Sequence, residues 1–162
     1  MPPSATVSKL IRVAPGSIWQ SWSDLPQWPR WHPETIEATW LEGEPWADGS
    51  RFGLLRRTPY PWLEKVPGVG ARRFMGIVRS AVSEQLLVWE LTPTSAAWLG
   101  PTLVESVRLI PAPGGTTVAL TLSTYGLLPS LLFPILPPLL RAQASKTLDA
   151  LHHKLSPIER RL

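Results

Sequence analysis

The sequence contains no cysteine among its 162 residues. This excludes disulfide bonds, catalytic thiolates and cysteine-ligated metal sites. The segment Met1–Val7 is short and polar and lacks the apolar core of a secretory leader, so we expect a cytoplasmic location. The sequence also lacks a Gly-x-Ser-x-Gly motif, a glycine-rich phosphate loop and a dinucleotide-binding fingerprint. We therefore predict no cofactor.

A metal site is not expected from the histidines either. His152 and His153 are adjacent on a predicted helix, so their side chains point about 100° apart. A pair of metal ligands on one helix face would instead be four residues apart. We predict no metal.

Charge of one sign is not concentrated in any segment. The net charge is +4 at pH 7. However, acidic residues lie between the basic pairs Arg56–Arg57, Arg72–Arg73 and Arg160–Arg161, and no nucleic-acid-binding motif accompanies them. The pattern is typical of a solvated surface rather than a nucleic-acid site. Modest attraction to an anionic membrane surface stays open.

Tryptophan and proline are abundant, with 9 and 19 residues respectively. Four of the tryptophans fall within Trp19–Trp31. Large aromatic side chains with few polar partners are typical of a core or an apolar cavity. The length suits one domain, which we place at residues 1–162 with its core at about 6–155.

Periodicity predicts a first strand over Thr6–Val13, followed by two short helices. The first helix begins near Pro15, and the second, Leu25–Trp31, has Asp24 as its expected N-cap. Alternating apolar residues then predict strands at 35–41, 50–57, 72–81, 85–92, 102–110 and 116–124. In the first of these, Ile36, Ala38 and Trp40 are expected to share a face.

A long helix is predicted over Leu139–Leu155, because apolar residues recur there at steps of three and four. The stripe consists of Leu140, Ala144, Leu148, Leu151 and Leu155. The short connections between strands favour an antiparallel sheet. We therefore predict an α+β fold in which a curved sheet wraps around the long helix and leaves a gap for a ligand.

Local motifs strengthen this interpretation. They are Ala14-Pro15 followed by Ile18-Trp19, Trp28-Pro29-Arg30-Trp31-His32-Pro33, Gly49-Ser50-Arg51-Phe52 and Gly114-Gly115-Thr116. Their order resembles the START-like, or SRPBCC, superfamily, which includes the polyketide cyclase/dehydrase group. The resemblance implies a helix-grip fold with a deep apolar cavity, and monomers or homodimers. It supplies no universal catalytic residue, so it does not fix the function.

The uncharged run GLLPSLLFPILPPLL, residues 126–140, has several interpretations. As a helix it would be about 22 Å long, short of a bilayer core of about 30 Å, and its prolines oppose a spanning helix. We expect either a lid that includes Leu132 and Phe133 or plain packing on the edge of the core. Transient docking on a membrane surface is a third interpretation.

Three residues are candidates for acid–base chemistry. His32 is expected near the cavity entrance, with a partly exposed helix-end position as the alternative. Glu105 shares its strand parity with Leu103 and would face the cavity if that face is inward. Tyr125 could offer a hydroxyl at the cavity mouth. Glu90 has the opposite parity to its apolar neighbours, and Arg73, Arg79 and Arg108 are expected mainly at the surface.

The expected partner is a small hydrophobic molecule such as a lipid or a polycyclic compound. The predicted ligand-binding residues are Trp22, Trp31, Phe52, Trp89, Leu120, Leu122, Leu132 and Phe133. Binding or carriage of such a ligand is the first hypothesis. The second is an enzyme similar to polyketide cyclases or dehydratases, and the third is a membrane- or protein-interaction module.

Overall fold

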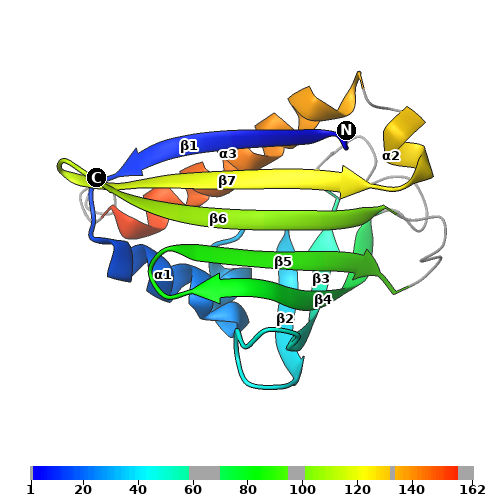
Figure 1. Ribbon diagram of the computed structural model, residues 1–162, viewed down its shortest axis with the longest axis horizontal. Helices are drawn as coiled ribbons and strands as arrows, with labels where there is room; N and C mark the ends of the chain where they lie inside the picture. The colour runs from blue at the N-terminus through cyan, green and yellow to red at the C-terminus, as the bar shows by residue number, and fades with distance from the viewer. Residues whose placement is uncertain (1, 59–69, 95–100, 132–133, 157–162) are drawn as a thin grey trace.

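The computed structural model describes residues 2–58, 70–94, 101–131 and 134–156. Its element order begins with one strand and two short helices, and a run of strands follows before the long C-terminal helix (Figure 1). The elements are β1 (Ser4–Ile11), α1 (Pro15–Ser23), the 3-10 helix η1 (Leu25–Arg30), β2 (Thr35–Glu42), β3 (Arg51–Arg57), β4 (Ala71–Val82), β5 (Leu86–Pro93), β6 (Thr102–Ala112), β7 (Gly115–Tyr125), α2 (Leu127–Leu131) and α3 (Leu136–Leu155).

The strands form one antiparallel sheet in the order β1-β7-β6-β5-β4-β3-β2. Helix α3 packs against β1 and β7, and α1 contacts α3 (Figure 1). The predicted α+β helix-grip fold is therefore confirmed. Within the described parts of the chain, no helix has both the length and the apolar character needed to span a bilayer.

Helix α3 buries the predicted stripe. Leu140, Ala144, Leu148 and Leu151 are buried, and Leu155 is partly buried. The helix begins at Leu136 rather than Leu139, because its prolines occupy the first turn, where their missing N–H groups have no helical partner to lose. The short helix α2 was not predicted, since it lies within the uncharged run that has no clear period.

Two local details differ from the predictions. The second short helix does begin at Leu25 with Asp24 at its N-cap position, but the Asp24 side chain makes no capping hydrogen bond, and the helix is of the 3-10 type with Pro26 and Pro29 inside it. In β2, Ile36 is exposed and does not share the inward face with Ala38. A register shift between Thr35 and Glu37 places Thr35 in the interior instead.

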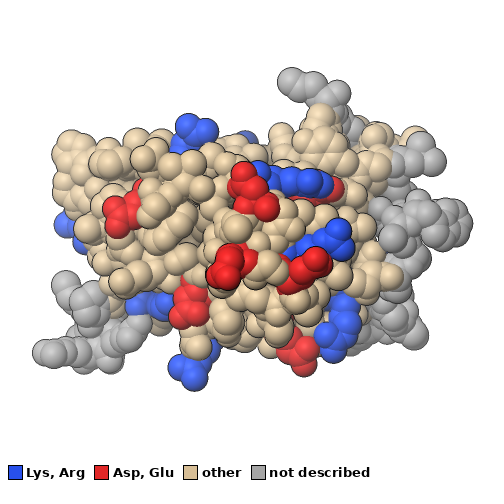
Figure 2. Space-filling view, turned by 60° about the horizontal axis from the view of Figure 1, so that its bottom comes forward, with Lys and Arg blue, Asp and Glu red and all other residues tan. Residues whose placement is uncertain are grey.

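The core lies between the concave face of the sheet and the helices. Alternate residues of β3, β5, β6 and β7 are buried, as expected for strands with one face on a core. The outer face carries ion pairs such as Arg79–Glu90 and Arg73–Glu37. Figure 2 shows acidic and basic side chains interspersed on one face, with no large patch of one sign.

One close approach in the sheet requires glycine. Gly76 on β4 is paired with Phe52 on β3, and the Phe52 ring lies directly over the Gly76 backbone. A Cβ atom at position 76 would be 2.2 Å from the nearest Phe52 ring atom. The Phe52 side chain is fully buried and has little room to withdraw.

We predict that Gly76→Ala destabilises the protein by about 1–3 kcal/mol, because the new methyl group overpacks the core against Phe52. Urea unfolding followed by circular dichroism measures the change. Gly53→Ala is the matched control, since a Cβ there meets Leu41 at 3.5 Å, an ordinary contact. Equal stabilities of the two variants would contradict the argument.

Candidate functional site

A cluster of buried polar side chains lies inside the sheet. His32 and Glu34 come from the connection between η1 and β2, Arg56 from β3, and Glu105 from β6. Their exposed fractions are 5%, 2%, 4% and 3%. Gln143 of α3 joins the cluster through a hydrogen bond to Glu34. Charged side chains are rarely this buried unless they are paired or functional.

An ion pair between Arg56 and Glu105 forms the centre of the cluster. Arg56 Nη1 donates to Glu105 Oε1, and Nη2 lies 3.2 Å from Oε2. In the sheet, β4 and β5 separate the two strands, so the pair spans the concave face. Burial opposes the charge on Arg56, but Glu105 and Glu34 together raise its pKa above the ordinary value. Arg56 is therefore a permanent buried cation.

Sequence analysis assigned Arg56 to the solvated surface, and this was wrong. Phe52, Leu54 and Arg56 alternate along β3 and all three are buried. The same parity that placed Phe52 and Leu54 on one face would have placed Arg56 there too. Glu105 does face inward, as expected from its parity with Leu103, Val107 and Leu109.

Glu34 is a member of the cluster that sequence analysis missed. Its Oε2 accepts a hydrogen bond of 2.7 Å from Gln143 Nε2, whereas its Oε1 is buried without a partner. Burial raises the pKa of Glu34 to about 7, and nearby Arg56 only partly offsets that effect. A carboxyl group that titrates near neutral pH can donate or accept a proton under physiological conditions.

His32 lies beside Glu34 and is buried, so the alternative of a partly exposed position was wrong. Its ring stacks on Trp28, with ring centres 5.7 Å apart. Nδ1 is 3.1 Å from Thr35 Oγ1 and accepts a weak hydrogen bond from the Glu34 N–H. Burial, and then Arg56, lower the pKa of His32 well below its usual value. The imidazole is therefore neutral at physiological pH.

A small cavity adjoins this cluster at the junction of β6, β7 and α3. Its volume is about 20 Å³, which is room for roughly one water molecule. The lining residues are Leu103, Glu105, Leu122, Ser123, Thr124, Leu140 and Gln143. The Thr124 hydroxyl is buried without a hydrogen-bond partner. Leu122 and Glu105, which sequence analysis had singled out, are paired across β7 and β6 and line this cavity together with Leu140 and Gln143 of α3.

The other predicted ligand-binding residues lie elsewhere. Trp22, Phe52, Trp89 and Leu120 are fully buried within the core. Trp22 is 5.8 Å from Trp89 between ring centres, and Trp28 packs edge-on to Phe52, so aromatic rings fill the middle of the interior. Trp31 lies at the outer border of this group. Leu132 and Phe133 lie outside the described residues.

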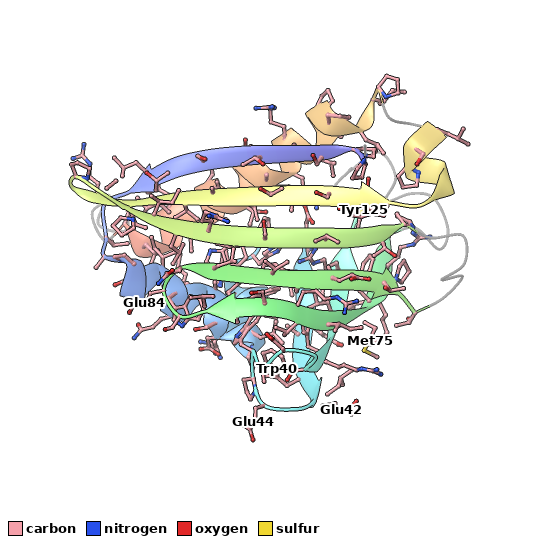
Figure 3. All side chains as sticks on the ribbon, viewed as in Figure 1. Trp40, Glu42, Glu44, Met75, Glu84 and Tyr125 are labelled. Atoms are coloured by element: carbon pink, nitrogen blue, oxygen red, sulfur yellow. The ribbon has the colours of Figure 1, made fainter. Side chains whose placement is uncertain are left out.

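Tyr125 does not belong to the cluster. It lies at the C-terminal end of β7, with 45% of its surface exposed (Figure 3). Glu90 points to the outer face, where it pairs with Arg79 at 2.8 Å. Arg73 and Arg108 are also exposed on the outer side. Of the three acid–base candidates, His32 and Glu105 both lie near Arg56, and Tyr125 does not.

The described residues contain no group of three histidine, aspartate or glutamate side chains placed to hold a metal ion. The cluster offers a fixed cation–anion pair, a neutral imidazole and a carboxyl group that can change its protonation near pH 7. Such a set can orient a polar group and exchange a proton with it.

Comparison with known proteins identifies relatives of this architecture. The family model described as "Polyketide cyclase / dehydrase and lipid transport" matches residues 2–156. No curated protein sequence matches the chain significantly.

Several solved structures share the fold at low sequence identity. Protein CV1439 from Chromobacterium violaceum has a TM-score of 0.71 at 14% identity, and the match covers 97% of this chain and 99% of that one. The Zhui aromatase/cyclase from Streptomyces sp. R1128 has a TM-score of 0.71 at 13% identity, covering 99% and 96%. The di-domain ARO/CYC StfQ of the steffimycin pathway has a TM-score of 0.70 at 13% identity, covering 93% of this chain and 49% of that one. At such identities these likenesses show the fold alone.

We predict that Arg56→Met costs about 3–5 kcal/mol of stability, because it leaves the Glu105 carboxylate buried without its partner. The double variant Arg56→Met/Glu105→Leu removes both charges and should recover much of this loss. Urea unfolding of the two single variants and the double variant measures the coupling. Strictly additive losses would show that the two side chains do not depend on each other.

We also predict a distinct pH dependence for Glu34→Gln. In the folded state Glu34 keeps its proton up to about pH 7, whereas its ordinary pKa is 4.5, so the folded protein holds more protons between these values. The free energy of unfolding therefore falls as pH rises through this window, by at most roughly 3 kcal/mol. The lowered pKa of His32 acts in the opposite direction below pH 6.5, since protonation there favours the unfolded chain.

Glu34→Gln removes the pH dependence of stability that comes from Glu34 and keeps the one that comes from His32. The variant should therefore gain stability relative to the unmodified protein as pH rises from 4.5 to 7, as measured by urea unfolding at several pH values. Glu37→Gln is the control, because the Glu37 side chain is 58% exposed. The argument is wrong if both variants follow the same profile relative to the unmodified protein.

Proposed function

Because the chain belongs to the polyketide cyclase/dehydrase and lipid transport family, we propose that it binds a small hydrophobic molecule between its sheet and α3. The ligand enters where β6, β7 and α3 meet. Its apolar part packs on leucine side chains, and one polar group of the ligand faces the buried cluster. Binding or carriage by this route needs no bound cofactor.

The observation that carries this proposal is the composition of the small cavity. Leu103, Leu122 and Leu140 supply apolar walls, and Glu105, Thr124 and Gln143 supply polar atoms beside them. An apolar site with a few convergent polar groups is the usual composition of a small-molecule site. The unpartnered Thr124 hydroxyl offers a hydrogen bond that a ligand oxygen would complete.

A volume of about 20 Å³ holds only a water molecule, so a larger ligand requires α3 to shift away from β6 and β7. Leu140 and Gln143 are the helix residues that would move with it. Each leucine-sized ligand group that is buried contributes about 1.5–3 kcal/mol. Several such groups are needed for micromolar affinity, which corresponds to about 8 kcal/mol. We therefore expect a ligand larger than the present cavity.

A second candidate function is acid–base catalysis on such a ligand. Glu34, whose pKa is about 7, and the neutral His32 favour it, because both lie within the same buried cluster. Glu34 could accept a proton from an acidic carbon or hydroxyl and return it, while Arg56 attracts the resulting negative charge. The two candidates differ in one result: an enzyme returns a changed molecule after incubation, and a carrier returns the same one.

Contact with a membrane surface stays a prediction. Leu131 and Ile135, on either side of the junction between α2 and α3, are 71% and 60% exposed, and exposed apolar side chains often mark contacts. The cytoplasmic location and the choice between monomer and homodimer also stay predictions.

We predict that Leu122→Phe weakens the binding of N-phenyl-1-naphthylamine, an apolar dye, by at least tenfold, because the larger ring fills the cavity. Dye fluorescence and native mass spectrometry measure the affinity and the stoichiometry. Thr121→Phe is the matched control, since it adds a ring on the outer face of the same strand. Equal affinities of the two variants would place the dye outside the proposed site.

A further inference from the structure

One wall of the small cavity between β6, β7 and α3 carries the polar atoms of three side chains. Glu105, Thr124 and Gln143 supply these atoms, and leucine side chains form most of the remaining wall. A polar group of a ligand that enters the cavity meets this wall first. The hydrogen-bonding capacity of the three side chains, and the charges next to them, therefore decide which polar group fits.

Thr124 contributes a hydroxyl that no other described group bonds. The residue is only 5% exposed, and its Oγ1 has no hydrogen-bond partner within the described part of the chain. By contrast, Thr116, which is buried on the same face of β7, donates a hydrogen bond of 2.9 Å to the Val13 carbonyl. A buried hydroxyl without a partner costs stability, and a ligand atom that bonds to it removes that cost.

Gln143 and Glu105 contribute acceptors. Gln143 donates through Nε2 to Glu34, which leaves the Oε1 atom of the same amide as an acceptor. The two carboxylate oxygens of Glu105 accept from Arg56 and keep lone pairs for a further donor. The wall therefore offers one hydroxyl that can donate and two groups that can accept.

The charges beside the cavity disfavour an anionic ligand. Arg56 is the buried cation of the cluster, and both of its terminal nitrogens already bond to Glu105. The carboxyl group of Glu34 lies close enough to act on the same cation. A ligand carboxylate would add a third acid beside one buried guanidinium, and part of the negative charge would then lack a partner.

We propose that the ligand carries an uncharged hydroxyl group, as in an apolar alcohol or a phenol, and places it against this wall; the inference rests on the proposed function. The hydroxyl accepts a hydrogen bond from Thr124 and donates one to Gln143 or Glu105. It thus makes the hydrogen bonds that a water molecule would make in a space of about 20 Å³. An ether or a ketone can only accept, and a carboxylate adds a charge, so these groups bind less tightly.

The test compares four probes that share a naphthalene ring. 2-Naphthol carries a hydroxyl, 2-methoxynaphthalene has an acceptor only, 2-naphthoate is an anion, and 2-methylnaphthalene has no polar group. Competition with N-phenyl-1-naphthylamine, followed by dye fluorescence at pH 7, gives the dissociation constants. We expect 2-naphthol to bind about tenfold more tightly than 2-methoxynaphthalene and at least about tenfold more tightly than 2-naphthoate.

Thr124→Val removes the hydroxyl and nearly keeps the shape of the side chain. It should weaken the binding of 2-naphthol about tenfold and change that of 2-methylnaphthalene by no more than about twofold. Thr121→Val is the matched control, because the Thr121 hydroxyl lies on the outer face of the same strand and bonds to Thr6 at 2.8 Å. This control should leave the affinities of all four probes unchanged.

The anionic probe should also respond to the charge of Glu34. The charged and titratable groups that face Glu34 are Arg56 of β3, Glu105 of β6, Lys146 of α3 and, on its own segment, His32. Because its pKa is about 7, Glu34 gains negative charge between pH 6 and 8. The affinity for 2-naphthoate should therefore fall roughly three- to tenfold over this range, and Glu34→Gln should abolish the fall.

The proposal is overturned if Thr124→Val weakens 2-naphthol and 2-methylnaphthalene equally. It is also overturned if 2-methoxynaphthalene or 2-naphthoate binds as tightly as 2-naphthol. Leu122→Phe separates this result from a failure of the proposed function. If Leu122→Phe weakens every probe but the probes bind alike and ignore Thr124, the internal site stands and the hydroxyl assignment fails. If Leu122→Phe changes no affinity, both fail. Circular dichroism of each variant shows whether a loss of binding reflects a loss of fold.

Discussion

The ion pair between Arg56 and Glu105 is the constraint on which the interior depends. A buried cation and anion are stable only when each satisfies the other, and these two meet across the concave face of the sheet. Once Arg56 is held as a cation, it disfavours a charge on His32, and Glu105 adds to the burial that disfavours one on Glu34. Burial is the largest cause of both shifted pKa values, and the charges of the ion pair then modify them.

The tryptophan cluster and the polar cluster divide the interior between them. Aromatic rings from η1, the segment after it and β5 fill the middle of the core, so the internal space identified in the structure lies at the junction of β6, β7 and α3. This arrangement places the polar groups between a rigid wall of rings and helix α3. A family that uses one fold for binding, transport and cyclisation can place different chemistry at such a junction, and the residues here combine neutral and charged groups.

Most of the fold could be predicted from the sequence, because strands and the long helix bury one face and so show their period. The candidate functional site was harder to predict from the sequence. Glu105 followed from its parity, whereas Arg56 shared the parity of Phe52 and Leu54 but was assigned to the surface because of its charge. Glu34 lies in an irregular connection after Pro33, where no period exists, and its environment depends on Gln143 from a helix distant in sequence. The register shift in β2 likewise has no clear sequence signal.

The span of the ion pair also bears on the order of folding. Arg56 and Glu105 are 49 residues apart in the chain, and β4 and β5 lie between their strands, so we expect the two side chains to meet only once the sheet has assembled. Both charges therefore stay hydrated until the sheet has its curvature, and contacts of such long range form late. An interaction that forms after the transition state slows unfolding without speeding folding. The pair thus contributes mainly to the lifetime of the native state rather than to the rate at which it is reached.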